Sequence, residues 1–198
     1  MIYFLLSLCL CLTYADSYKV DVDSSSIQWI GRKVTGEHDG NLEILYGNIR
    51  RYLDTKNTEV IRGNIVIDMT TITNKDIENK QYQKYLVDHL KDEDFFDVAH
   101  FSKSELKIIS NDPISLTDNS SNTKITAEIT IKGITKEIEF PAKIEFFDDF
   151  AIATGTIDID RTLFGIRYKS KSYFPDMGDY FIYDDFTLNF SIKAIKNK

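Results

Sequence analysis

The clearest alternation of hydrophobic and polar positions in this chain runs through residues 123–147. Every second residue from 125 to 131 is isoleucine or alanine, and threonine or glutamate stands between them. Gly133 interrupts the run, and a similar alternation continues through residues 134–146. A period of two residues is typical of a strand with one face in the core and one in water. Two such strands joined at a glycine predict a long antiparallel hairpin.

The stretches on both sides of this hairpin also have β character, so further strands are expected to cover its apolar face. Those strands are predicted at residues 18–22, 26–34, 42–49, 59–69, 99–110, 150–159 and 186–194. Long antiparallel strands with one wet face commonly close into a barrel, because closure leaves no exposed edge. About eight strands enclose an interior sized for side chains or for one small ligand. We therefore predict an all-β fold, an extended antiparallel barrel of about eight strands.

The stretches between the predicted strands are polar, and one of them has the period of a helix. Turns or loops are expected at residues 36–40, 51–58, 111–122 and 160–180. The connection between the strands predicted at 59–69 and 99–110 is different. There the less polar side chains recur at i, i+3, i+4, i+7 and i+8, as Tyr82, Tyr85, Leu86, His89 and Leu90. This stripe predicts one inserted amphipathic helix over about residues 74–90, with Thr73 or Asn74 as its N-cap. The helix is expected to pack on the barrel or to close one end of it.

The alternation also predicts which side chains face the barrel interior. The candidates are Ile125, Ala127, Ile129, Ile138, Phe140, Ala142, Ile144, Ala151, Ala153, Ile157, Phe190 and Ile192. The pattern alone does not distinguish the lining of a cavity from a filled core. Ala151, Ala153 and Gly155 are three small residues on one apolar face, where a packed core would hold larger side chains. They either leave space for a ligand or accommodate Phe140 or Phe146 opposite.

Length and composition are those of one globular domain with a substantial core. The chain has 198 residues, of which 42% are hydrophobic and 28% charged. Its net charge of −7 gives no sign of the basic surface that nucleic-acid binding usually needs. The same balance argues against an anionic membrane surface as a partner. We expect neither a nucleic-acid partner nor stable membrane insertion.

The first fifteen residues differ from the rest of the chain. Residues 2–12 form an apolar run of eleven residues, which is too short to span a bilayer. Thr13-Tyr14-Ala15 offers a cleavage site, so we predict a signal peptide over residues 1–15 and a barrel domain over 16–198. No lysine or arginine precedes the run, and the alternative is a buried terminal strand. Both cysteines lie in this segment, so a mature chain would contain neither a disulfide nor a cysteine-based metal site.

The sequence contains no recognisable catalytic motif. The three histidines, His38, His89 and His100, lack the spacing of known metal sites. No G-x-S-x-G, P-loop or G-x-G-x-x-G motif is present. We predict no catalytic residues and no metal ligands. His38, His89 and Arg161 are instead candidates for the mouth of a ligand cavity.

Five groups of residues, in the same order along the chain, resemble one known family. They are Trp29, Gly31, Lys33, Gly36, His38 and Gly40; then Gly47, Gly63 and Asp68-Met69; then His89-Leu90-Lys91 with Asp94-Phe95-Phe96-Asp97; then Ile131-Lys132-Gly133-Ile134-Thr135-Lys136; and last Arg161 with Phe164-Gly165-Ile166. Together they are similar to the motifs of the YceI family, the bacterial polyisoprenoid-binding proteins. One departure is that Leu86 and Val87 stand where many relatives carry an Arg-Asp pair.

The resemblance implies a lipocalin-like barrel whose tunnel holds a long isoprenoid chain, in a protein exported to the periplasm or secreted. The expected function is therefore the non-catalytic binding, carriage or storage of an isoprenoid lipid or quinone. We expect no cofactor, the isoprenoid or quinone being a bound ligand, and a homodimer is one possible assembly. Two alternatives remain open. One is an enzyme of envelope metabolism or stress defence that uses His38 or His89, and the other is a structural barrel without a ligand.

Overall fold

The computed structural model describes residues 15–114 and 120–198, so the predicted signal peptide lies outside the described residues except for Ala15. Within these ranges the chain forms β1 (Ala15–Val20), β2 (Ser26–Lys33), β3 (Gly36–Leu53), β4 (Glu59–Asp68), β5 (Lys103–Pro113), β6 (Thr123–Ile131), β7 (Ile134–Phe146), β8 (Phe150–Asp160) and β9 (Ile182–Lys196). The α-helix α1 spans Lys80–Lys91. Four short 3-10 helices are η1 (Val22–Ser24), η2 (Met69–Thr71), η3 (Arg161–Phe164) and η4 (Pro175–Tyr180).

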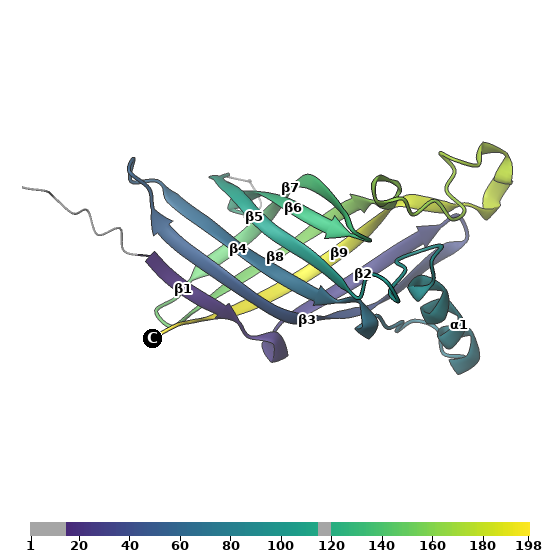
Figure 1. Cartoon of the computed structure of the whole chain (residues 1–198), viewed down its shortest axis with the longest axis horizontal. Coiled ribbons are helices and arrows are strands. Elements are labelled where there is room, and N and C mark those ends of the chain that lie inside the picture. The colour runs from purple at the N-terminus through teal and green to yellow at the C-terminus, as the bar shows by residue number, and fades with distance from the viewer. Residues whose placement is uncertain (1–14, 115–119) are drawn as a thin grey trace, which may run out of the picture.

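Eight of the nine strands form a closed antiparallel barrel. The neighbours run in the order β3-β2-β9-β8-β7-β6-β5-β4, and β4 pairs with β3 to complete the circle. The barrel is elongated, with α1 at one end and β1 towards the other (Figure 1). The predicted all-β barrel of about eight strands with one inserted helix is confirmed.

β1 is the additional strand, and it fills a gap in the barrel wall. It pairs with β3 through residues 15–19 and with β9 through residues 18–20. The β2–β9 ladder ends where Ser26 faces Ser191, so the final residues of β9 have no partner in β2. β1 supplies that partner, and backbone groups that would otherwise lie at an exposed edge are hydrogen-bonded.

The predicted central hairpin is formed by β6 and β7. Ile131 faces Ile134 across the ladder, so the loop contains only Lys132 and Gly133. Both loop residues have positive φ, 51° and 72°. This combination is the one that two-residue hairpin turns use to match the twist of the flanking strands. The glycine that interrupts the sequence pattern therefore marks the turn, as predicted.

The turn predicted at residues 36–40 is wrong. β3 already begins at Gly36, and residues 36–40 pair with residues 29–33 of β2. Gly40 is needed for a different reason, since a Cβ atom there would lie 1.8 Å from the carbonyl oxygen of Thr73. The glycine allows the connection after η2 to pass directly over β3. From the sequence, Gly40 was interpreted as a turn residue. In the structure it lies within a strand and permits close packing of two backbone segments.

The predicted helix exists, but it begins at Lys80 rather than near residue 74. The side chain of Asn79 accepts hydrogen bonds from the backbone of Gln81 and Tyr82 and so caps the first turn. Asn74, one of the two predicted caps, is buried and donates to the carbonyl oxygen of Asp39. Its side chain thus ties the connection to β3 instead of starting a helix.

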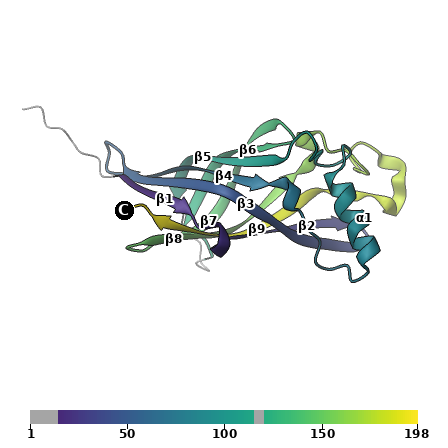
Figure 2. The same ribbon diagram turned by 60° about the horizontal axis from the view of Figure 1, so that its bottom comes forward.

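α1 covers the end of the barrel that is opposite to β1 (Figure 2). It contacts the interior through its last turn. Leu90 is buried, and Leu86 and Val87 pack against the core. Tyr82 and Tyr85 are 68% and 73% exposed, so the first part of the predicted stripe faces solvent. No helix in the described part of the chain is long and apolar enough to cross a membrane.

Candidate functional site

The barrel interior contains a cavity of about 100 Å³, here called the inner cavity. Its 21 lining residues are all isoleucine, leucine, phenylalanine or alanine. They are Ile27, Ile49, Ile61, Ile65, Ile67, Leu106, Ile108, Ile125, Ile129, Phe140, Ala142, Ile144, Phe146, Ala151, Ile152, Ala153, Ile157, Leu188, Phe190, Ile192 and Ala194. The interior therefore holds space next to its packed side chains, and that space has apolar walls.

Ten of the twelve side chains predicted to face the interior line the inner cavity. The ten are Ile125, Ile129, Phe140, Ala142, Ile144, Ala151, Ala153, Ile157, Phe190 and Ile192. Ala127 is fully buried in the packed core, and Ile138 is half-buried against it. The positions of these residues are established by the structure, whereas their role as ligand contacts stays a prediction.

Sequence reasoning missed the opposite wall of the inner cavity. That wall includes Ile61, Ile65 and Ile67 of β4 and Leu106 and Ile108 of β5. All five show the same period of two as the hairpin. The signal was present, but which strands face one another across a barrel depends on closure, and the pattern of a single strand does not give it.

The small residues on β8 have two different roles. Ala151 and Ala153 line the inner cavity, so their size leaves open space. A Cβ atom at Gly155 would lie 2.7 Å from Cζ of Phe190, so this glycine makes room for an aromatic ring. The ring of Phe190 in turn packs edge-to-face on Phe140, with 5.9 Å between the ring centroids. Space beside Ala151 and Ala153 is therefore present, and its use by a ligand stays a prediction. The ring accommodated at Gly155 is that of Phe190, not Phe140 or Phe146 as expected.

A second cavity of about 80 Å³, the outer cavity, lies on the side of α1. It shares Ile67, Ile129 and Leu188 with the inner cavity, so the two cavities adjoin at these three side chains. Its other lining residues are Trp29, Gly31, Leu42, Met69, Ile72, Leu90, Phe95, Phe96, Ser104, Ile131, Arg161, Ile182, Tyr183, Asp185 and Phe186. We refer to the two cavities together as the tunnel.

The outer cavity is bounded mainly by apolar side chains. In β9 the alternation directs Phe186 and Leu188 into the barrel, so Asp185, which precedes Phe186 and is exposed, points outward. The indole nitrogen of Trp29 donates to the carbonyl oxygen of Thr73 at 2.9 Å, which satisfies its only donor. Ser104 is buried at 5% exposure. The tunnel as a whole therefore favours a hydrocarbon chain over a charged ligand.

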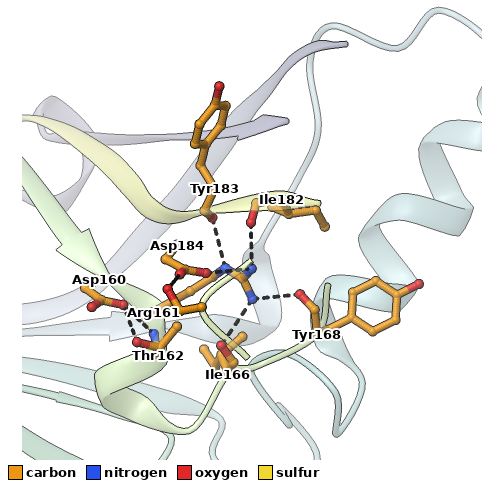
Figure 3. Close-up of polar contacts among 9 residues, drawn as sticks. Asp160, Arg161, Thr162, Ile166, Tyr168, Ile182, Tyr183 and Asp184 are labelled. Atoms are coloured by element: carbon orange, nitrogen blue, oxygen red, sulfur yellow. Dashed lines mark hydrogen bonds and ion pairs between the residues drawn. The ribbon is translucent and has the colours of Figure 1, made fainter. Parts of the chain in front are cut away.

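Arg161 lies at the end of the outer cavity, where its guanidinium group is held by backbone carbonyl groups (Figure 3). Its Nε donates to Tyr183, its Nη1 to Ile166 and Tyr168, and its Nη2 to Ile182, at 2.9–3.1 Å. The remaining N–H points to the carboxylate of Asp184 at 3.4 Å. A guanidinium has five N–H donors, so all of them have partners inside the protein. Direct bonding to a ligand would require one of these contacts to break.

The ion pair of Arg161 and Asp184 is buried, and it changes the titration of both groups. Burial lowers the pKa of Arg161, while the charges of Asp184 and Asp160 oppose this change. Burial by itself would raise the pKa of Asp184. Hydrogen bonds from neighbouring serines and the charge of Arg161 outweigh it, and the pKa of Asp184 lies below its ordinary value. The lowered pKa of Asp184 keeps its carboxylate charged at neutral pH, where it pairs with the guanidinium of Arg161.

The two histidines predicted at the mouth lie in different surroundings. Nδ1 of His38 is 2.7 Å from the carboxylate of Asp76, and this pair joins β3 to the connection before α1. His38 is not among the lining residues of the tunnel. His89 packs against Phe95, which lines the outer cavity, and against Tyr168. Its Nε2 is buried and has no hydrogen-bond partner in the described part of the chain.

Comparison with known proteins gives one family and several similar structures. The model of the YceI-like domain matches residues 18–194. BcnA of Burkholderia cenocepacia aligns with a TM-score of 0.64 and 16% identity, over 88% of this chain and 99% of that chain. A polyisoprenoid-binding domain of Saccharophagus degradans aligns with a TM-score of 0.60 and 11% identity, over 91% and 98%.

A YceI protein of Campylobacter jejuni aligns with a TM-score of 0.51 and 19% identity, over 69% of this chain and 73% of that chain. At these identities the similarity establishes the shared fold. No curated protein matches the sequence.

Proposed function

The chain belongs to the YceI-like domain family, and from this premise we propose that it binds an isoprenoid lipid or quinone in its tunnel without transforming it chemically. The observation that supports the proposal best is the inner cavity, whose lining residues are all apolar. The similar domain of Saccharophagus degradans is itself described as polyisoprenoid-binding. The role is that of a carrier or store.

The energetic basis of the proposal is the burial of hydrocarbon. Each CH₂ group that moves from water into an apolar site contributes about 0.8 kcal/mol. Part of this gain is offset by the ordering of a flexible chain on binding. Directional bonds are not required for affinity, so a site without polar lining groups can still hold a long lipid.

The wall formed by β7, β8 and β9 favours a branched chain. Ala142, Ala151, Ala153 and Ala194 lie on these adjacent strands and line the inner cavity. Alanine leaves more space near the backbone than the isoleucines of the facing wall do. The methyl branches of an isoprenoid fit such a surface better than they fit a uniformly filled one.

The alternative of an enzyme based on His38 has less support. The imidazole of His38 is engaged with Asp76 outside the tunnel. A reaction on a tunnel-bound lipid would need a polar group beside the reacting atom. The inner cavity offers none among its described lining residues.

We also propose that the protein acts in the cell envelope, either in the periplasm or after secretion. This location rests on the predicted signal peptide over residues 1–15. N-terminal sequencing of protein recovered from the periplasm or the medium tests it, and Asp16 is the expected first residue. A chain recovered only from the cytoplasm with Met1 intact would contradict the location.

Enlarging Ala153 to phenylalanine tests the proposed binding site. Trp29 is the single tryptophan and lines the outer cavity, so its fluorescence reports a ligand in the tunnel. We expect geranylgeraniol to change this signal saturably in the wild type. In Ala153→Phe the added ring occupies the inner cavity, and affinity should fall at least about tenfold, the effect of losing about 1.4 kcal/mol.

The matched control is Thr156→Phe on the same strand. Thr156 is exposed and lies an odd number of residues from Ala153, so it is on the opposite face. This variant should bind the lipid as the wild type does. A structural barrel without a ligand would give no saturable signal in any of the three proteins. Equal affinity in all three would contradict the assignment of the inner cavity.

A further inference from the structure

The two ends of the tunnel are built differently. The outer cavity is lined by Leu90 of α1, and the inner cavity by Ile49, whose partner in the ladder is Tyr18 of β1. α1 and β1 lie at opposite ends of the barrel (Figure 1). Ile49 of β3 and Phe146 of β7 line the inner cavity. Both residues lie near β1. Ile49 pairs with Tyr18 of β1 across the ladder, and Phe146, the last residue of β7, has its ring next to that of Tyr18. The side chains beyond them decide whether a ligand can pass.

Tyr18 stands beyond the inner cavity and contacts Phe146. Its side chain faces the interior because its partner across the ladder, Ile49, also faces the interior. Tyr18 is 1% exposed, and its ring centroid lies 5.7 Å from that of Phe146. The two rings therefore pack against each other at this end of the barrel, and a hydrocarbon chain in the inner cavity meets them.

An ion pair supports the two rings from the solvent side. The guanidinium carbon of Arg51 lies 4.2 Å from the ring centroid of Phe146. Nε of Arg51 donates to the carboxylate of Glu59 at 2.6 Å, and Nη2 contacts the same oxygen. Cation–π contact and a charge-assisted bond together hold the arginine in place. We name the group of Tyr18, Arg51, Glu59 and Phe146 the end plug.

We propose that the end plug limits the length of the hydrocarbon tail that the tunnel accepts, and that Phe146 is the residue that sets this limit. The inference rests on the proposed function. The tail occupies the inner cavity with its terminus against Phe146, and the head group lies on the side of α1. A tail that is too long leaves its polar end unable to settle at the outer cavity, or leaves carbon atoms in water.

A series of all-trans prenyl alcohols that differ by single isoprene units measures the limit. Affinity is followed by the fluorescence of Trp29, which lines the outer cavity. In the wild type, affinity should rise with each added unit until the tail reaches the end plug, and then stop rising. In Phe146→Ala the tail length at which affinity stops rising, here called the break, should increase by about one unit, because a phenyl ring is removed from the end of the cavity.

Two further variants strengthen the test. Ala151 faces Phe146 across the β7–β8 ladder and lines the inner cavity, so Ala151→Leu should move the break towards shorter tails. Phe147→Ala is the matched control, because Phe147 is 46% exposed and is not a lining residue. It should leave the break unchanged. If Phe146→Ala unfolds, then Phe146→Leu and Ala151→Leu still provide shifts in opposite directions.

The outcomes separate this inference from the proposed function. A break at the same tail length in the wild type, Phe146→Ala and Ala151→Leu would overturn the role of the end plug while leaving lipid binding intact. An equal shift in Phe147→Ala would also overturn it. The absence of saturable binding for every prenyl alcohol in the wild type would instead overturn the proposed function, and the inference with it.

Discussion

Burial changes what a charged side chain does, and Arg161 is the clearest example in this protein. The sequence made it a candidate for the mouth of a ligand cavity. In the structure it is 3% exposed, and its donors bind four backbone carbonyl groups and Asp184. Those carbonyl groups belong to the loop after η3 and to the start of β9. The side chain therefore joins two segments that approach each other at the end of the barrel (Figure 3).

Replacement of Arg161 by lysine should be costly despite the retained charge. Lysine cannot reproduce the planar set of donors, so several buried carbonyl groups lose their partners. We expect the free energy of unfolding to fall by about 3–5 kcal/mol, because each buried carbonyl group left without a partner costs about 1–3 kcal/mol. Urea unfolding measures the loss. Arg167→Lys, an exposed matched control, should stay within about 0.5 kcal/mol of the wild type, and equal losses in both variants would contradict this role.

Asp184 should contribute to the acid sensitivity of the fold. Its folded pKa lies below the ordinary value of 3.8, so near that pH the unfolded chain binds more protons than the folded one. Its stabilising contribution is therefore complete above about pH 4 and is lost as the pH falls through the lower folded pKa. In Asp184→Asn, stability should depend less steeply on pH in this acidic window.

Urea midpoints measured across the acidic range and at neutral pH provide that comparison. Asp176→Asn removes an exposed carboxylate from η4 and should keep the slope of the wild type. An unchanged slope in Asp184→Asn would show that other carboxylates govern the acid sensitivity.

The residues that could be predicted from the sequence are those whose role depends on strand alternation. Ten candidates line the inner cavity because the period of two fixes the face of each side chain. Arg161 was not predictable in its role, since its carbonyl partners at Ile182 and Tyr183 follow about twenty residues later in the chain. The same holds for Gly155, whose neighbour Phe190 comes from β9.

At the scale of elements, the strands were predictable and their connections were less so. The β6–β7 hairpin follows from alternation and one glycine, which are both local signals. The start of α1 is set instead by Asn79, which caps its first turn, whereas Asn74 ties the connection to β3. The wrong turn prediction at residues 36–40 has a similar cause. Gly40 is a glycine because the backbone of Thr73 lies too close to it for a side chain. Connections are decided by tertiary contacts that sequence patterns do not contain.

A methyl group at Gly155 should disturb both the β8–β9 wall and the tunnel. The new Cβ would lie 2.7 Å from the ring of Phe190 and 2.9 Å from the carbonyl oxygen of Pro141. Phe190 lines the inner cavity, so the clash should push its ring into the space for the ligand. We expect Gly155→Ala to lower the unfolding free energy by about 1–3 kcal/mol and to weaken prenyl-alcohol binding.

Gly31→Ala is the control for that substitution. Gly31 also lies in a barrel strand, but a Cβ atom there has its nearest neighbour at 3.8 Å. This variant should be as stable as the wild type or slightly more stable, because alanine loses less conformational entropy than glycine. If urea unfolding gave the same loss for both variants, close packing at Gly155 would not be the cause.

The whole molecule is a barrel with a tunnel between two different ends. The end plug blocks one of them, and α1 with Phe95 and Phe96 lies over the other. The barrel and its helix were predictable because long amphipathic strands have few other ways to bury one face. The cavities were not, since the alternation of a strand is the same for a filled core and for a hollow one. A hollow core differs from a filled one in how the side chains of facing strands pack against each other, which is a tertiary property.

The central claim is that the tunnel holds an isoprenoid lipid, and native mass spectrometry tests it most directly. The protein is purified without denaturation, measured intact, and then extracted with organic solvent. We predict one additional mass per chain and an extract that contains a molecule built from isoprene units, with both reduced in Ala153→Phe. A mass that stays at that of the bare chain, even after incubation with prenyl alcohols and quinones, would contradict the account.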